Sequence, residues 1–251
     1  MKFLAPLTLL ILLAAASCTS TGVGNPPSAE LNVTVVNDLT AEPQATDPTV
    51  QLSTSELRHV VVAFGKLNWK PCDPADANVI APGPFVVDLV TNKIEPPLPP
   101  VPVPPGGFCG MDAPLTTSAP NAELQGRSIL FSGLRSDGTL FILYAAMAGT
   151  LHMVPEPGVK WNTATSSSII WALRPHRWLA PAELDAETSD PLGAVLRVIV
   201  IDVNRHPILY TAIRNRIGGR SSFYADLDGT HTITEHDRTN GLIGEGLPSL
   251  D

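Results

Sequence analysis

Short runs of β-branched, aliphatic and aromatic residues, separated by turn-forming residues, constrain the fold of this chain more than any other feature. In the first run, 30–38, Leu31, Val33 and Val35 alternate with polar residues, which is the period of a half-buried strand. Seven more runs follow, at 59–64, 84–90, 127–134, 140–147, 150–154, 167–173 and 196–202. Asp137-Gly138 separates two of them and predicts a hairpin turn. We therefore predict a mainly β protein, built as an antiparallel β-sandwich.

Two helices and one proline-rich connection complete the predicted architecture. Pro181 lies in the first turn of a predicted helix at 179–187, and Pro207 begins a second helix that Gly218 ends. We expect Ile208, Leu209, Ala212, Ile213 and Ile217 to share the apolar face of this second helix. The run "PPLPPVPVPP" at 96–105 predicts a polyproline II segment on the domain surface, either a spacer or a ligand for a proline-binding partner.

The N-terminus is typical of an export signal. Lys2 precedes a short apolar stretch with small residues at its end, and about 14 apolar residues are too few to span a bilayer. Ala15, Ala16 and Ser17 lead directly into Cys18, and this stretch resembles the lipobox of bacterial lipoproteins. The resemblance implies that residues 1–17 are removed and that Cys18 is lipidated. Residues 18–29 are then a lipidated cysteine with a flexible tether.

The cysteines and the net charge restrict the cellular compartment and the class of partner that we expect. Cys72 and Cys109 remain once Cys18 is assigned to lipid, and in an oxidising compartment we expect them to form a disulfide, with two buried free thiols as the alternative. The bond would close a loop of about 38 residues and contribute about 3–4 kcal/mol. A formal net charge of −8 argues against nucleic acid as a partner.

The acidic segment "DLDGTHTITEHD", residues 226–237, has the spacing of a twelve-residue calcium loop. The predicted ligands, at loop positions 1, 3, 5, 7 and 12, are Asp226, Asp228, Thr230, Thr232 and Asp237. His231 stands at position 6, where the turn favours glycine, and Asp237 replaces the usual bidentate glutamate, so we predict weak calcium binding. The alternative is a plain turn at Asp228-Gly229 with solvated acids.

Evidence for catalysis is absent from the sequence. The chain contains no GxSxG, SxxK, HExxH or phosphate-binding loop. A zinc site is the other possibility for the acidic segment, but its candidate ligands, His231, Glu235, His236 and Asp237, do not have the spacing of a helical zinc site. The four tryptophans are either core residues or a stacking surface for sugars. We therefore expect a protein that is not an enzyme, with no certain cofactor.

Several segments resemble uncharacterised lipoproteins of myxobacterial type. These segments are "FVVDLVTNKIEPPLPPVPVPPGGFCG", "GRSILFSGLRSDGTLFIL", "RPHRWLAPAELDAE" and "SSFYADLDGTHTIT". The resemblance implies a transthyretin-like β-sandwich, similar in architecture to an immunoglobulin domain, followed by a short acidic loop. Here the loop departs from the DxDGDG pattern at Thr230 and His231.

Together these features predict a lipid-anchored protein of the bacterial outer membrane. We expect a β-sandwich at 30–190 and, at 191–251, a C-terminal strand, helix and acidic loop. The predicted function is a non-enzymatic binding or structural module of the envelope, with an envelope protein or a glycan as partner. The alternatives are a carbohydrate-binding or calcium-dependent adhesion module and an envelope hydrolase without a recognisable motif.

Overall fold

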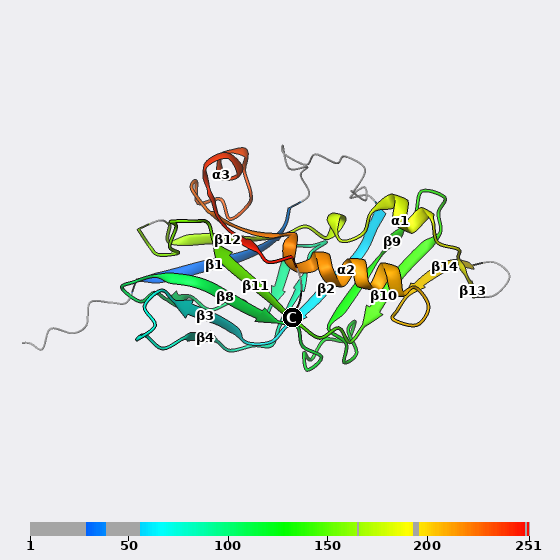
Figure 1. Ribbon diagram of the computed structural model, residues 1–251, viewed down its shortest axis with the longest axis horizontal. Helices are drawn as coiled ribbons and strands as arrows, with labels where there is room; N and C mark the ends of the chain where they lie inside the picture. The colour runs from blue at the N-terminus through cyan, green and yellow to red at the C-terminus, as the bar shows by residue number, and fades with distance from the viewer. Residues whose placement is uncertain (1–28, 39–55, 165, 193–195, 249, 251) are drawn as a thin grey trace, which may run out of the picture.

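The protein is mainly β, with two sheets and three short helices toward the C-terminus (Figure 1). The structure is a computed structural model that describes residues 29–38, 56–164, 166–192, 196–248 and 250. The predicted signal segment, Cys18 and almost all of the tether lie outside the described residues. In the described part of the chain, no helix has the length and apolar character needed to cross a membrane.

The larger sheet has nine strands and curves until its two edge strands, β4 and β7, come into contact. In spatial order the strands are β4 (Val79–Ala81), β3 (Leu67–Pro71), β8 (Phe108–Pro114), β11 (Thr150–Pro155), β16 (Leu242–Gly246), β15 (Ser221–Ala225), β12 (Ser168–Leu173), β1 (Glu30–Asn37) and β7 (Val101–Pro102). Strands from the last third of the chain, β15 and β16, therefore lie in the middle of this sheet.

The smaller sheet has seven strands and lies beside the larger one (Figure 1). In spatial order they are β13 (Asp190–Leu192), β14 (Leu196–Ile201), β10 (Leu140–Ala145), β9 (Ile129–Leu134), β2 (Leu57–Phe64), β5 (Phe85–Asp88) and β6 (Lys93–Glu95). Strands β9 and β10 form the hairpin predicted at Asp137-Gly138, where Gly138 has a φ of 81°.

All eight predicted runs form strands, and the structure adds others that the sequence pattern did not reveal. The additional strands are short, or carry glycine, proline and polar residues, as in "FCGMDAP" of β8 and "VIA" of β4. The prediction of a purely antiparallel arrangement is wrong at two places, because β1 pairs with β12 and β10 pairs with β14 in parallel. Both parallel pairs join strands far apart in sequence, which local alternation cannot reveal.

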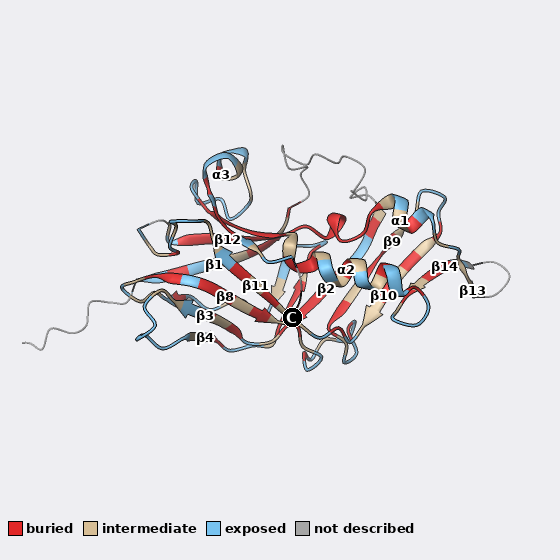
Figure 2. Ribbon diagram, viewed as in Figure 1, coloured by how far each residue is buried: buried red, intermediate tan, exposed pale blue. Residues whose placement is uncertain are grey.

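One continuous hydrophobic core runs through both sheets, seen as the buried stripes along the strands in Figure 2. Trp69, Trp161, Trp171 and Trp178 all belong to it and are 0–1% exposed. Rings of Phe223, Trp69 and Trp161 pack with centroids 4.8–6.1 Å apart, a typical aromatic spacing. The tryptophans are thus core residues, and none presents a face to a sugar.

The helices lie close to the predicted positions. Helix α1 is Pro181–Asp185 and α2 is Pro207–Gly219. Helix α2 contacts β11 and β16 of the larger sheet and β14 of the smaller one, and its Leu209, Ile213 and Ile217 are buried in the main core. Ile208, predicted on this face, is instead 72% exposed. The buried side chains of α2 are spaced four residues apart and start at Leu209, so the preceding residue points away from them. A third helix, α3 (Glu235–Asn240), was not predicted.

The proline run connects the two sheets and contributes an edge strand. Val101-Pro102 forms β7 against Glu30 and Leu31 of β1, and the Val103 N–H donates to the Ala29 carbonyl oxygen at 2.8 Å. The prediction of a purely surface segment is therefore wrong here: Val101 is 3% exposed. The valines between the prolines supply N–H groups and apolar side chains, whereas proline is tolerated at the sheet edge.

Candidate metal centre

The acidic loop lies between β15 and β16 and is held at both ends. The Ala225 N–H donates to the Gly241 carbonyl oxygen at 2.7 Å, so the segment returns to the point where it left the sheet. The Asp226 N–H donates to the Ser168 carbonyl oxygen on β12 at 3.1 Å. The first predicted ligand is therefore positioned by the sheet itself.

An apolar contact fixes the middle of the loop. Ile233 packs on a small cluster formed by Val36, Ile170, Ala172 and Tyr224, on strands β1, β12 and β15. This cluster is separate from the main core, because alternate side chains of a strand point to opposite faces of its sheet. Ile233 occupies position 8 of the predicted calcium loop, which is the hydrophobic position.

Three of the five predicted ligands come together. One carboxylate oxygen from each of Asp226, Asp228 and Asp237 lies within 4.8 Å of the others. No second group of three or more acidic, histidine or cysteine ligands with this spacing occurs in the described part of the chain. Asp226 and Asp237 are buried, and Asp228 is exposed.

Asp226 is the most unusual member of the cluster. Its side chain is 0% exposed, and its Oδ2 lies 2.9 Å from Nδ1 of His231 and accepts the His231 N–H at 3.3 Å. Its Oδ1 is buried and has no hydrogen-bond partner among the described residues. A buried carboxylate oxygen without a partner has lost its hydration without compensation, which is unfavourable.

Asp237 organises the loop and the start of α3. Its Oδ1 accepts the Leu227 N–H at 2.9 Å, and its Oδ2 accepts the Thr234 N–H at 2.9 Å and the Thr234 hydroxyl at 2.7 Å. Thr234 in turn caps the helix by accepting the Asp237 N–H at 3.3 Å. This reciprocal capping box explains why a helix begins at Glu235.

The two predicted threonine ligands lie next to Asp228. The Thr230 hydroxyl donates to Asp228 Oδ1 at 2.8 Å, and the Thr230 hydroxyl oxygen also lies 3.2 Å from the carbonyl oxygen of Thr232. Hydrogen bonding by Thr230 lowers the pKa of Asp228, because it favours the charged form of the carboxylate. Hydroxyl, carbonyl and carboxylate oxygens therefore gather on one side of the loop.

His231 does not break the loop despite replacing glycine. Its φ is 57°, in the left-handed region, and Gly229 two residues earlier has a φ of 70°. Histidine is one of the residues enriched in this region, and the contacts of His231 with Asp226 hold it there. The turn that the sequence predicted to be degenerate is formed.

The structure does not bring together the side chains that the sequence offered as zinc ligands. His236 Nδ1 lies 3.2 Å from the side-chain nitrogen of Asn240, one turn along α3. Within the described residues, no cluster unites His231, Glu235 and His236 as metal ligands.

Beside the loop lies a buried ionic network that sequence reasoning missed. Asp38, at the end of β1, accepts from Arg174 Nε at 3.0 Å and from Arg238 Nη2 of α3 at 3.0 Å. Arg174 also donates to the Ser222 hydroxyl at 2.9 Å and the Tyr224 hydroxyl at 2.6 Å. The network ties α3, and with it the acidic loop, to β1, β12 and β15. The one available signal in the sequence was a charged residue, Arg174, directly after the apolar run 169–173.

Two histidines elsewhere pair with carboxylates. His152 Nδ1 lies 2.7 Å from Asp112 Oδ1, which also contacts Lys70 Nζ at 2.7 Å. His206 lies between Glu187 and Asp190, with nitrogen–oxygen distances of 2.9 and 3.3 Å. Both histidines thus contact carboxylates of neighbouring segments.

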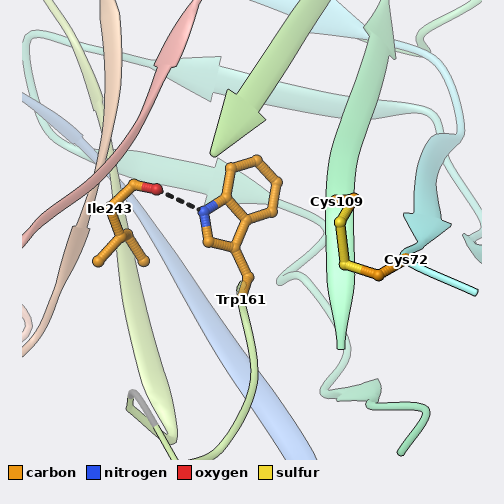
Figure 3. Close-up of a disulfide and its surroundings, with 4 residues drawn as sticks. All are labelled: Cys72, Cys109, Trp161 and Ile243. Carbon is orange, nitrogen blue, oxygen red and sulfur yellow. Dashed lines mark hydrogen bonds between the residues drawn. A yellow bond between two sulfur atoms is a disulfide. The ribbon is translucent and has the colours of Figure 1, made fainter. Parts of the chain in front are cut away.

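The predicted disulfide is present. Cys72, directly after β3, is bonded to Cys109 on β8, and these neighbouring strands pair with one another (Figure 3). Nearby, Trp161 Nε1 donates to the Ile243 carbonyl oxygen on β16 at 2.8 Å (Figure 3). Cysteine pairing and aromatic packing therefore stabilise the same end of the larger sheet.

Comparison with protein-family models, with curated proteins and with solved structures found no match to this chain.

Proposed function

We propose that this chain is a non-enzymatic, lipid-anchored protein of the bacterial outer membrane that displays its β module as a binding or structural element of the envelope. The observation that carries the proposal is the apolar export segment ending in "AAASC" at Cys18. Acyl chains on Cys18 would hold the protein on the membrane, since each buried methylene contributes about 0.8 kcal/mol.

The disulfide supports export. Disulfides persist in oxidising compartments such as the periplasm and the cell surface, and are rare in the cytosol. The Cys72–Cys109 bond therefore agrees with a protein that leaves the cytoplasm. Its sequence separation of 37 residues makes it a structural crosslink between strands rather than a CxxC redox pair.

The finer description of the fold belongs to the same proposal. We propose that the two sheets and their common core represent a transthyretin- or immunoglobulin-like sandwich enlarged by further strands. A module of this kind would present loops and sheet edges to an envelope protein or a glycan. Because all four tryptophans are buried, a glycan would have to be recognised by other side chains.

Metabolic labelling with a fatty-acid probe tests the anchor. We expect the full-length protein to incorporate the probe and Cys18→Ala to lose it. Cys72→Ala is the matched control, because it removes a cysteine from the folded domain and should keep the label. Equal labelling of Cys18→Ala and the unchanged protein would refute lipidation at Cys18.

A stoichiometric partner would identify the structural role. We expect capture of the full-length protein from detergent-solubilised membranes to recover one envelope protein at a constant ratio to the bait. Recovery of a peptidase or glycosidase activity with the purified protein itself would instead favour the hydrolase alternative.

A further inference from the structure

We propose that the acidic loop binds one calcium ion through the carboxylates of Asp226, Asp228 and Asp237, with the Thr230 hydroxyl and the Thr232 carbonyl as further oxygen ligands. The proposal names the ligands through which the displayed β module would bind calcium. It depends only on the loop, so it stands or fails independently of the lipid anchor.

The first argument is the buried carboxylate. Asp226 projects a side chain with 0% exposure into the three-carboxylate cluster, and its Oδ1 has no hydrogen-bond partner among the described residues. Buried charges in proteins are normally paired or bound to a metal. A cation within the cluster would supply the partner that this oxygen needs.

The second argument is the balance of charge. Three carboxylates with oxygens within 4.8 Å repel one another, most strongly where they are shielded from water. His231 Nδ1 contacts Asp226, whereas Arg238, the cation adjacent to Asp237, donates to Asp38. A divalent ion would compensate most of the negative charge of the three carboxylates.

The ligand atoms select the metal. All the candidate ligands are oxygens, which suits hard cations and not zinc or copper. They come from a loop that combines carboxylate, hydroxyl and carbonyl groups, and calcium accepts six to eight such ligands in flexible geometry. Magnesium requires near-octahedral coordination and gives up its water reluctantly, so it should bind more weakly.

The existing hydrogen bonds leave room for coordination. Asp237 Oδ1 accepts one N–H, from Leu227, and a carboxylate oxygen has a second lone pair available. Both left-handed residues, Gly229 and His231, turn the backbone within the first half of the loop. Helix α3 then begins at Glu235, so a bound ion would fix the helix that carries Arg238 toward Asp38.

Calcium titration of the full-length protein, purified in detergent and treated with EDTA, tests the proposal. An ion that binds only the folded state raises stability by an amount set by its concentration relative to the dissociation constant. With a dissociation constant of about 0.1–1 mM, typical of extracellular modules, we expect 10 mM calcium to raise the Tm by about 3–11 °C. Equilibrium dialysis should give one calcium ion per chain.

Variants separate the site from general charge effects. Asp228→Asn changes an exposed ligand, so it should fold normally and weaken calcium binding by about tenfold or more. Asp76→Asn removes the same charge from an exposed position between β3 and β4, and should titrate like the unchanged protein. Magnesium at the same concentration should give less than half of the Tm shift.

Three results would overturn the proposal. One is the absence of any saturable shift up to 10 mM calcium together with no bound ion in dialysis. Another is an unchanged dissociation constant in Asp228→Asn. The third is an equal loss of binding in Asp76→Asn, which would show unspecific attraction to an acidic protein.

Discussion

The buried network around Arg174 predicts a large loss of stability when its guanidinium is removed. Arg174 and Asp38 are each 2% exposed, and the three donor nitrogens of Arg174 reach Asp38, Ser222 and Tyr224. In Arg174→Met the two hydroxyls lose a charged donor, and Asp38 stays buried with one fewer cation. Met keeps much of the apolar length of the side chain, so the change tests charge more than packing.

The expected size follows from the burial of the pair. Removal of one partner of a buried ion pair costs about 3–5 kcal/mol. Because Arg238 still contacts Asp38, we place Arg174→Met near the lower end, at about 3 kcal/mol. For a domain of this size, 1 kcal/mol corresponds to about 2–4 °C, so the Tm should fall by about 6–12 °C.

Thermal unfolding at neutral pH, followed by circular dichroism, measures the effect. Lys93→Met is the matched control, because Lys93 pairs with Glu95 on the surface and its loss should leave the Tm unchanged. Asp38→Asn combined with Arg174→Met should be less destabilised than the sum of the single variants, since it removes the carboxylate that lost one of its two cations. A Tm loss in Arg174→Met no larger than that in Lys93→Met would refute the reasoning.

Two further perturbations have defined outcomes. Replacing Cys72 and Cys109 together by alanine should cost about 3–4 kcal/mol and make the Tm insensitive to reductant, whereas a double variant as stable as the oxidised protein would contradict a structural role for the bond. Glu183 accepts from Arg216 on α2 and from the Ala180 N–H, and these bonds lower the pKa of Glu183. The contribution of the Glu183 carboxylate to the free energy of unfolding is therefore present above the usual glutamate pKa of about 4.3. It is lost as the pH falls through the lower pKa of the folded state. We expect Glu183→Gln to lose about 1 kcal/mol or less at pH 7, and its Tm to approach that of the unchanged protein as the pH falls from the usual glutamate pKa through the lower pKa of the folded state. A difference independent of pH would show that charge is not the cause.

Some features of the candidate site could be predicted from sequence and others could not. The ligand spacing of Asp226, Asp228 and Asp237 is local, so it can be read along the chain, and the structure brings these three together. Sequence reasoning treated His231 as damage to the turn, because glycine is the usual residue there. The structure places His231 at a φ of 57° and holds it through Asp226, a contact that one-dimensional spacing does not show.

Patterns in the sequence were enough to predict the β character of the protein, its eight strongest strands, two helices and the disulfide partners. The strands and helices could be predicted because alternation, turn residues and composition are properties of a few neighbouring residues. The disulfide could be predicted because only two cysteines remain once Cys18 is assigned to the lipid anchor. Tertiary structure alone decided the two parallel pairings, the position of β15 and β16 inside the larger sheet, and the burial of Asp226. It also decided the contacts of Asp38 with Arg174 and Arg238, which lie 136 and 200 residues away in sequence. Such contacts depend on which strands become neighbours when one common core is buried, and local periodicity does not record that choice.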